Sequence, residues 1–212
     1  MIYRTVLTAL LCASLSAGAA AASEVMRAPQ VTAAVTQAAV PVQTDWQTAK
    51  AYTRPMLDPA KPDYTIMGKA EIPAPQMVRF IRQRNPHPKI NTTLEDLVQT
   101  YYDEAGREGV RADVALCQAL KETGYFNYGG DVSPDQNNFC GMGVTKTGMK
   151  GNSFKKPAEG IRAQIQHLQA YACTDRLKQK CIDPRYTYVN RGCAEYVEHL
   201  GIHENPKGQG WA

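Results

Sequence analysis

Residues 113–126 read DVALCQALKETGYF, and this stretch decides the fold class. Its apolar positions recur at the spacing of a helix with one buried face. These positions are Val114, Leu116, Cys117 and Leu120. Gly124 follows, and glycine readily adopts the left-handed conformation that ends helices. We therefore predict an apolar helix that begins near Asp113 and has Gly124 as its C-cap.

Three further helices are predicted around this stretch. Residues 75–84 are helical in pattern and stop at an Asn-Pro-His-Pro sequence, because proline cannot continue a helix. The next helix opens at Thr92, which is expected to form a capping box with Glu95, and its apolar positions extend to Ala105. The last helix spans residues 158–172. The fold class is therefore mainly α, with a long Gly/Asn-rich loop before the last helix.

The N-terminal part of the chain has a different composition. Residues 1–22 contain Arg4, a short apolar run and a series of small residues, which is typical of a secretory signal peptide. Residues 23–63 are rich in Ala, Pro and Thr and have few large apolar side chains, so we expect a flexible spacer. We therefore predict a secreted, periplasmic or cell-wall-associated protein whose one folded domain is residues 64–212.

Charge and hydropathy exclude two classes of partner. The formal net charge of +4 is spread along the chain without a basic patch, which argues against a nucleic-acid-binding protein. After the signal peptide, no segment is apolar enough to span a membrane, which takes about 20 residues. We expect a monomer that works without a cofactor or metal.

Five cysteines follow the signal peptide, and in an oxidising compartment most should pair. Cys173 and Cys181 flank a short polar loop and could close it, and Cys117 and Cys140 flank the segment of chemical interest. Because five is an odd number, at least one thiol stays free or pairs with another chain. The connectivity is left open.

Glu122 is the candidate acid, since it lies in the last turn of the apolar helix. Burial and the negative end of the helix dipole both raise the pKa of a carboxyl group. A carboxylic acid that stays protonated near neutral pH is what a glycosidase needs to protonate a leaving oxygen.

The residues around Glu122 are suited to binding amino sugars. Aromatic faces stack on sugar rings, and amides bind hydroxyl and N-acetyl groups. The candidate substrate-binding residues are Gln118, Tyr125, Phe126, Tyr128, Gln136, Asn137, Asn138 and Phe139.

A set of segments in fixed order resembles a known family. They are EGVRADVA (108–115), ETGYF (122–126), GGDV (129–132), QNNF (136–139), GIRAQIQHL (160–168), DPRY (183–186) and GWA (210–212). The chain from residue 66 onward is similar to the bacterial peptidoglycan endo-β-N-acetylglucosaminidases, whose glucosaminidase domain has a lysozyme-like fold. The resemblance implies that residues 64–212 are a catalytic domain that cleaves the glycan strand after N-acetylglucosamine.

The resemblance also assigns roles to single residues. It implies that Glu122 is the general acid and that Tyr186 assists in the active site. Glu159 and Asp131 are the candidates for a second carboxylate, although a substrate acetamide could act as the nucleophile instead. Relatives usually have small residues in place of Cys117 and Cys140, which suggests a disulfide between the catalytic helix and the Asn-Asn loop.

Several alternatives remain open. His199 and His203 lie near Cys193 with a spacing seen in zinc sites, and Cys117 with His167 could serve as a protease pair. A muramidase or a lytic transglycosylase would also place one acid on a helix of the same fold. A catalytically silent wall-binding module is the alternative from a different class.

Overall fold

The structure is a computed structural model that describes residues 64–200. The predicted signal peptide and spacer, His203 and the GWA segment lie outside the described residues. Within this range, the α-helices are α2 (Ala74–Arg84), α3 (Leu94–Glu108), α4 (Ala112–Glu122) and α5 (Pro157–Ala172). Short 3-10 helices follow at η2 (Pro134–Gln136), η3 (Tyr186–Tyr188) and η4 (Val197–His199). The predicted mainly α class is confirmed.

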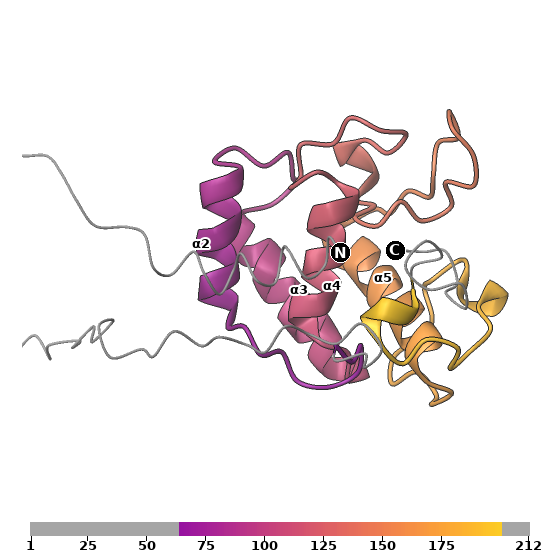
Figure 1. Cartoon of the computed structure of the whole chain (residues 1–212). Coiled ribbons are helices and arrows are strands. Elements are labelled where there is room, and N and C mark those ends of the chain that lie inside the picture. The colour runs from indigo at the N-terminus through magenta and orange to yellow at the C-terminus, as the bar shows by residue number, and fades with distance from the viewer. Residues whose placement is uncertain (1–63, 201–212) are drawn as a thin grey trace, which may run out of the picture.

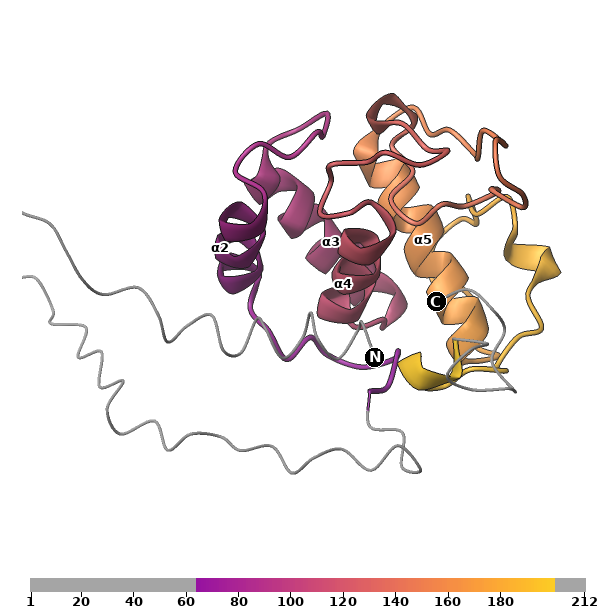
Figure 2. The same ribbon diagram turned by 45° about the horizontal axis from the view of Figure 1, so that its top comes forward.

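The helices form one packed body with α3 at its centre (Figure 1). α3 packs against α2, α4 and α5, and α4 also contacts α5. α4 is the most deeply enclosed helix, since every residue from Ala112 to Leu120 is buried. The chain between α4 and α5 gathers at one end of the bundle, while the segment after α5 returns along that helix (Figure 2). The C-terminal end of α4 therefore meets this loop.

Sheet pairing in the described part of the chain is limited to two isolated bridges. Thr65 pairs with Tyr196, and Met67 pairs with Val110. The segment that enters the domain is thus tied both to its C-terminal end and to the turn before α4. None of the described helices is both long and apolar enough to cross a bilayer.

A buried ion pair fixes the start of α4. The Arg111 Nη2 atom lies 3.0 Å from Asp113 Oδ2, and both side chains are almost fully buried. The same carboxylate accepts hydrogen bonds from the backbone N–H groups of Glu71 and Ile72. These contacts hold the start of α4 against the entering segment. Loss of either charged side chain would leave the other buried without a partner, which is destabilising.

The predicted capping box at the start of α3 is wrong by one residue. The N-cap is Thr93, and its hydroxyl accepts the backbone N–H of Asp96 at 3.1 Å. Glu95 does not reach back to the cap, because its carboxylate pairs with Arg82 of α2. An ion pair between helices has replaced the local contact that the pattern at Thr92 suggested.

The end of α4 also differs from the prediction. Its C-cap is Thr123, and the Thr123 hydroxyl donates to the Ala119 carbonyl and accepts the Phe126 N–H. Gly124 follows with a φ of 57°, one residue later than a C-cap position. The helix ends before Gly124 because the Thr123 hydroxyl bonds the Ala119 carbonyl and the Phe126 N–H. A glycine cap has no side chain and would need backbone groups for these hydrogen bonds.

The cysteines of the described residues are free thiols. The disulfide suggested between Cys117 and Cys140 is not formed. Cys117 belongs to the main hydrophobic core, whereas Cys140 belongs to a smaller cluster with Met142 and Ala163. Burial raises the pKa of both thiols, so each is held in its protonated form. The pairing of Cys173 with Cys181 is likewise absent from this structure.

Candidate active site

Glu122 is the last residue of α4. A methyl group built on Gly141 would lie 4.0 Å from Glu122 Oε2, so the carboxyl group lies against this glycine. The φ of Gly141 is 67°, a conformation that side chains other than glycine rarely adopt. A glycine at this position leaves space beside the carboxyl group that a larger residue would occupy.

The pKa of the Glu122 carboxyl group is raised. Its main cause is burial, and Lys121 lowers the pKa without reversing the shift. The side chain is nevertheless exposed at the molecular surface. Both observations fit a carboxyl group that has protein on one side and an open approach on the other. Such a group can hold a proton and still meet a ligand.

The chain directly after Glu122 is held in a strained conformation. Tyr125, Phe126 and Tyr128 have φ values of 59°, 61° and 59°, in the left-handed region that non-glycine residues seldom adopt. Each such residue costs on the order of 1 kcal/mol or more. Backbone hydrogen bonds offset this cost: the Tyr125 N–H donates to Leu120 O at 2.7 Å and the Phe126 carbonyl accepts Lys89 N–H at 2.9 Å. The surroundings thus fix the chain that leaves Glu122.

The amides of the Asn-Asn loop point into the protein. Gln136 donates to the carbonyls of Gly151 and Asn152, and Asn137 donates to the Phe154 carbonyl. Asn138 is 1% exposed; its amide nitrogen binds the carbonyls of Met142 and Asn152, and its oxygen accepts the Met142 N–H. These three side chains were candidates for contact with the sugar. In this geometry they hold the loop that carries Gly141 beside Glu122.

The two phenylalanines and Gln118 are also internal. Phe126 and Phe139 are fully buried and meet edge to face, with ring centroids 6.1 Å apart. A buried ring cannot stack on a sugar, so their place in the structure is that of core residues. Gln118 is 0% exposed and accepts a hydrogen bond from Gln164. Tyr125 and Tyr128 are the half-buried members of the predicted set, and Tyr125 packs against Phe80.

The candidate second carboxylates are engaged with the backbone. Asp131 Oδ1 accepts the Gly148 N–H at 2.9 Å, and Glu159 Oε2 accepts the Lys155 N–H at 3.0 Å. Glu159 lies in the first turn of α5, where a carboxylate complements the helix dipole. Both side chains therefore have a structural contact of their own, which the sequence pattern did not reveal.

Tyr186 lies in η3, beside the C-terminal half of α5. Its hydroxyl donates to Gln169 Oε1 at 3.4 Å, and burial raises its pKa. The guanidinium of Arg191 lies over its ring, 5.4 Å from the centroid.

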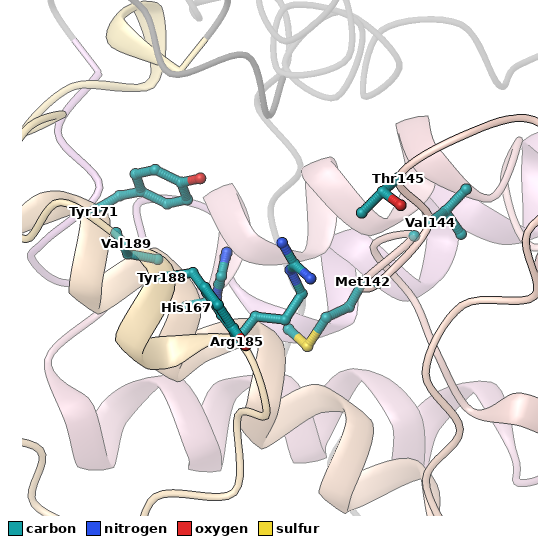
Figure 3. A pocket seen from close by; sticks show the side chains of 10 residues that line it. Met142, Val144, Thr145, His167, Tyr171, Arg185, Tyr188 and Val189 are labelled. Carbon is teal, nitrogen blue, oxygen red and sulfur yellow. The ribbon is translucent and has the colours of Figure 1, made fainter.

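A cavity of about 190 Å³ adjoins the Glu122 region. Residues 141–145 form one wall, and His167 and Tyr171 of α5 form another. Arg185, Tyr188 and Val189 complete the lining, with Arg185 between Tyr171 and the 141–145 wall (Figure 3). Gly141 connects the two places, since it lines this cavity and also lies against the Glu122 carboxyl group. The pKa of Cys140 is raised mainly by burial, and the nearby charges of Glu122 and Asp183 add to the shift.

None of the residues that line this cavity was predicted as a residue of the glycosidase site, and His167 was considered only as a protease partner of Cys117. His167 Nδ1 lies 2.6 Å from Asp183 Oδ2, and the His167 ring packs edge to face on Tyr171. Tyr188 is 76% exposed, which is unusual for so large a side chain. Arg185 and His167 lie within segments that supported the family resemblance. Nothing in their spacing indicated that a cavity joins them.

Two of the alternative chemistries lack support in the described residues. No group of three or more His, Cys, Asp or Glu side chains between residues 64 and 200 could hold a metal ion. His199 packs on Tyr196 instead, with ring centroids 5.2 Å apart. A protease pair requires a reactive thiolate, whereas burial raises the pKa of Cys117.

A helical domain in which a buried helix ends in a carboxyl group of raised pKa, near a cavity, has the features expected of a lysozyme-like glycoside hydrolase. The comparison of sequences then identifies the family. Residues 98–207 match the Glucosaminidase family, described as mannosyl-glycoprotein endo-beta-N-acetylglucosaminidase, and the chain belongs to this family of glycoside hydrolases.

The chain is also similar to one bacterial protein. The chain is 38% identical over 135 residues to a protein of Borreliella burgdorferi that is described as uncharacterized. The aligned part covers 64% of this chain and 66% of that protein, slightly less than two thirds of the relative's length. No solved structure matches the chain significantly.

Proposed function

We propose that this protein is an exported peptidoglycan hydrolase that cleaves the β-1,4 bond after N-acetylglucosamine, with Glu122 as the general acid. The observation that carries the proposal is the position of Glu122. Its carboxyl group has a raised pKa, lies against Gly141 and remains open to solvent on one side. A glycosidic oxygen that entered from this side would meet a carboxyl group whose raised pKa favours its protonated form.

In the proposed reaction, the proton of Glu122 moves to the glycosidic oxygen as the bond from that oxygen to the sugar C1 breaks. Asp131 and Glu159 each accept a backbone hydrogen bond, which favours the substrate's own acetamide oxygen as the group that bonds to C1. Water then adds at C1, the bond to the acetamide oxygen breaks, and Glu122 recovers its proton. Tyr186, beside α5, is proposed to assist in the site.

The nature of the newly formed sugar ends tests the proposed bond. Peptidoglycan is digested with the purified protein, reduced with borohydride and analysed by mass spectrometry, with Glu122→Gln as the inactive control. N-acetylglucosaminitol ends are expected. Muramitol ends would identify a muramidase and anhydromuramic ends a lytic transglycosylase, and either result would overturn the proposed bond. Absence of any new end with the wild type would favour a wall-binding module.

Export is proposed from residues 1–22, which lie outside the described residues. The proposed substrate is a glycan outside the cytoplasmic membrane, so the protein must be exported to reach it. We further propose a monomer in solution, since one chain carries both Glu122 and the adjoining cavity.

Replacing Lys121 should change the pH dependence of the reaction in a defined direction. Lys121 lowers the pKa of Glu122, so Lys121→Met should raise that pKa further. Because the acid acts in its protonated form, the alkaline limb of kcat/KM should move to higher pH. The measurement is kcat/KM against pH for the wild type, Lys121→Met and the exposed control Lys69→Met. A limb that moves to lower pH, or moves equally in both variants, would contradict the assignment of this limb to Glu122.

A further inference from the structure

The cavity beside Glu122 carries a positive charge without a carboxylate partner in the described part of the chain. Among its lining residues, Arg185 is charged and none is acidic. Four other arginines of the described domain pair with carboxylates: Arg82 with Glu95, Arg107 and Arg162 with Glu104, and Arg111 with Asp113. Arg185 differs from these four arginines because its guanidinium faces a cavity and not a carboxylate.

Asp183 is the nearest acidic residue in the sequence, and the described residues show it in an ion pair with His167 and not with Arg185. Asp183 Oδ2 lies 2.6 Å from His167 Nδ1, and Asp183 Oδ1 accepts the backbone N–H of Arg185 at 2.7 Å. The buried Asp183 thus holds the backbone of Arg185 and leaves the guanidinium to the cavity. The guanidinium itself lies over the Tyr188 ring, 5.1 Å from its centroid.

The arrangement provides both a charge and a sugar-binding surface. Tyr188 is 76% exposed, and such aromatic faces stack on sugar rings. Arginine binds carboxylates through paired N–H groups, and the contact is stronger in a partly desolvated cavity than in open water. A cavity of about 190 Å³ admits a small acidic group, since one water occupies about 30 Å³. Gly141 links this cavity to Glu122, because it lines the cavity and lies against the Glu122 carboxyl group.

We propose that Arg185 and Tyr188 form a subsite for a carboxylate carried by the muramic acid residue next to the scissile bond. This inference rests on the proposed function of Glu122. The carboxylate comes either from the free lactyl group of a bare strand or from an acidic stem peptide. The subsite distinguishes peptidoglycan from neutral polymers of N-acetylglucosamine.

Binding to protein with the Glu122→Gln change tests the subsite without turnover. Calorimetry is carried out with a neutral N-acetylglucosamine tetrasaccharide, with a muramyl tetrasaccharide that has free lactyl groups, and with one that has acidic stem peptides. When Arg185→Gln is added to the Glu122→Gln protein, the affinity for at least one acidic ligand should fall about tenfold. The affinity for the neutral tetrasaccharide should change less than twofold. The acidic ligand that loses affinity identifies the source of the carboxylate.

Two controls separate a binding role of Arg185 from a structural one. Arg107→Gln removes the same charge from a residue that pairs with Glu104, and it should leave all three affinities unchanged. Amidation of the ligand carboxylates should weaken binding about tenfold in protein that retains Arg185, so the test does not depend on how the variant folds. Equal losses for neutral and acidic ligands, or no loss on amidation, would overturn the subsite. If the wild type fails to cleave peptidoglycan yet shows these differences in binding, the proposed function fails and the subsite stands.

Discussion

Glu122→Gln is expected to lower kcat on peptidoglycan about 10³-fold, because the amide cannot donate the proton that the leaving oxygen needs. Glutamine has nearly the same shape as glutamate, so the contact with Gly141 should persist. Turnover is measured by reducing ends released from purified peptidoglycan. A variant that retained more than a tenth of wild-type activity would end the case for Glu122 as the acid.

The same variant has an expected effect on stability with a definite sign. The pKa of Glu122 is raised in the folded protein, so its ionisation opposes folding. The contribution of this group is favourable at low pH and is lost as pH rises through the raised pKa. Relative to Glu122→Gln, the wild type should therefore become less stable as pH increases above the normal range of a glutamate. Chemical unfolding of both proteins at several pH values checks this.

Matched controls separate an acid from residues that only support the site. Glu159→Gln and Asp131→Asn keep a carbonyl oxygen for their backbone contacts with Lys155 and Gly148. Each should lower kcat less than about 10²-fold, below the range of a lost acid or base. A loss as large as that of Glu122→Gln in either variant would identify it as the second catalytic carboxylate.

Gly160→Ala is expected to be the most damaging single-methyl change in the described domain. A Cβ atom at Gly160 would lie 1.8 Å from the backbone oxygen of Asn137 and 3.0 Å from its carbonyl carbon. Backbone cannot yield as a flexible side chain does, so either α5 or the Asn-Asn loop must move. The expected loss in the free energy of unfolding is about 3 kcal/mol or more, measured by urea denaturation.

Gly106→Ala provides the control, since it is the same substitution within a helix. Gly106 lies in α3, is exposed and has no atom within 4 Å of an added Cβ. Alanine there should stabilise the protein by about 0.5–1 kcal/mol, because it has the higher helix propensity. If Gly160→Ala were as stable as Gly106→Ala, the close packing of the loop on α5 would be wrong. Reduced activity in a folded Gly160→Ala protein would show that this packing places Gly141 beside Glu122.

Much of the fold could be read from local patterns. The apolar spacing from Val114 to Leu120 and the prolines after residue 84 placed the helices to within about three residues, since helix formation depends on neighbouring residues. The cap of α3 was misplaced because Glu95 pairs with Arg82 of another helix, a contact that no local pattern contains. The position of Glu122 at the end of an apolar helix was likewise a local property.

By itself, then, the sequence determined the helices, the place of Glu122 at the end of α4 and the family, all of which follow from the order of residues along the chain. The tertiary structure decided which polar side chains face outward. Asn138 faces inward because it binds the Met142 carbonyl of the same loop, and Phe139 faces inward because it packs on Phe126. Arg185 and Tyr188 came to line a cavity with residues 141–145, more than 35 residues away in the chain. Burial and long-range contact depend on how distant segments pack, and a one-dimensional pattern does not carry that information.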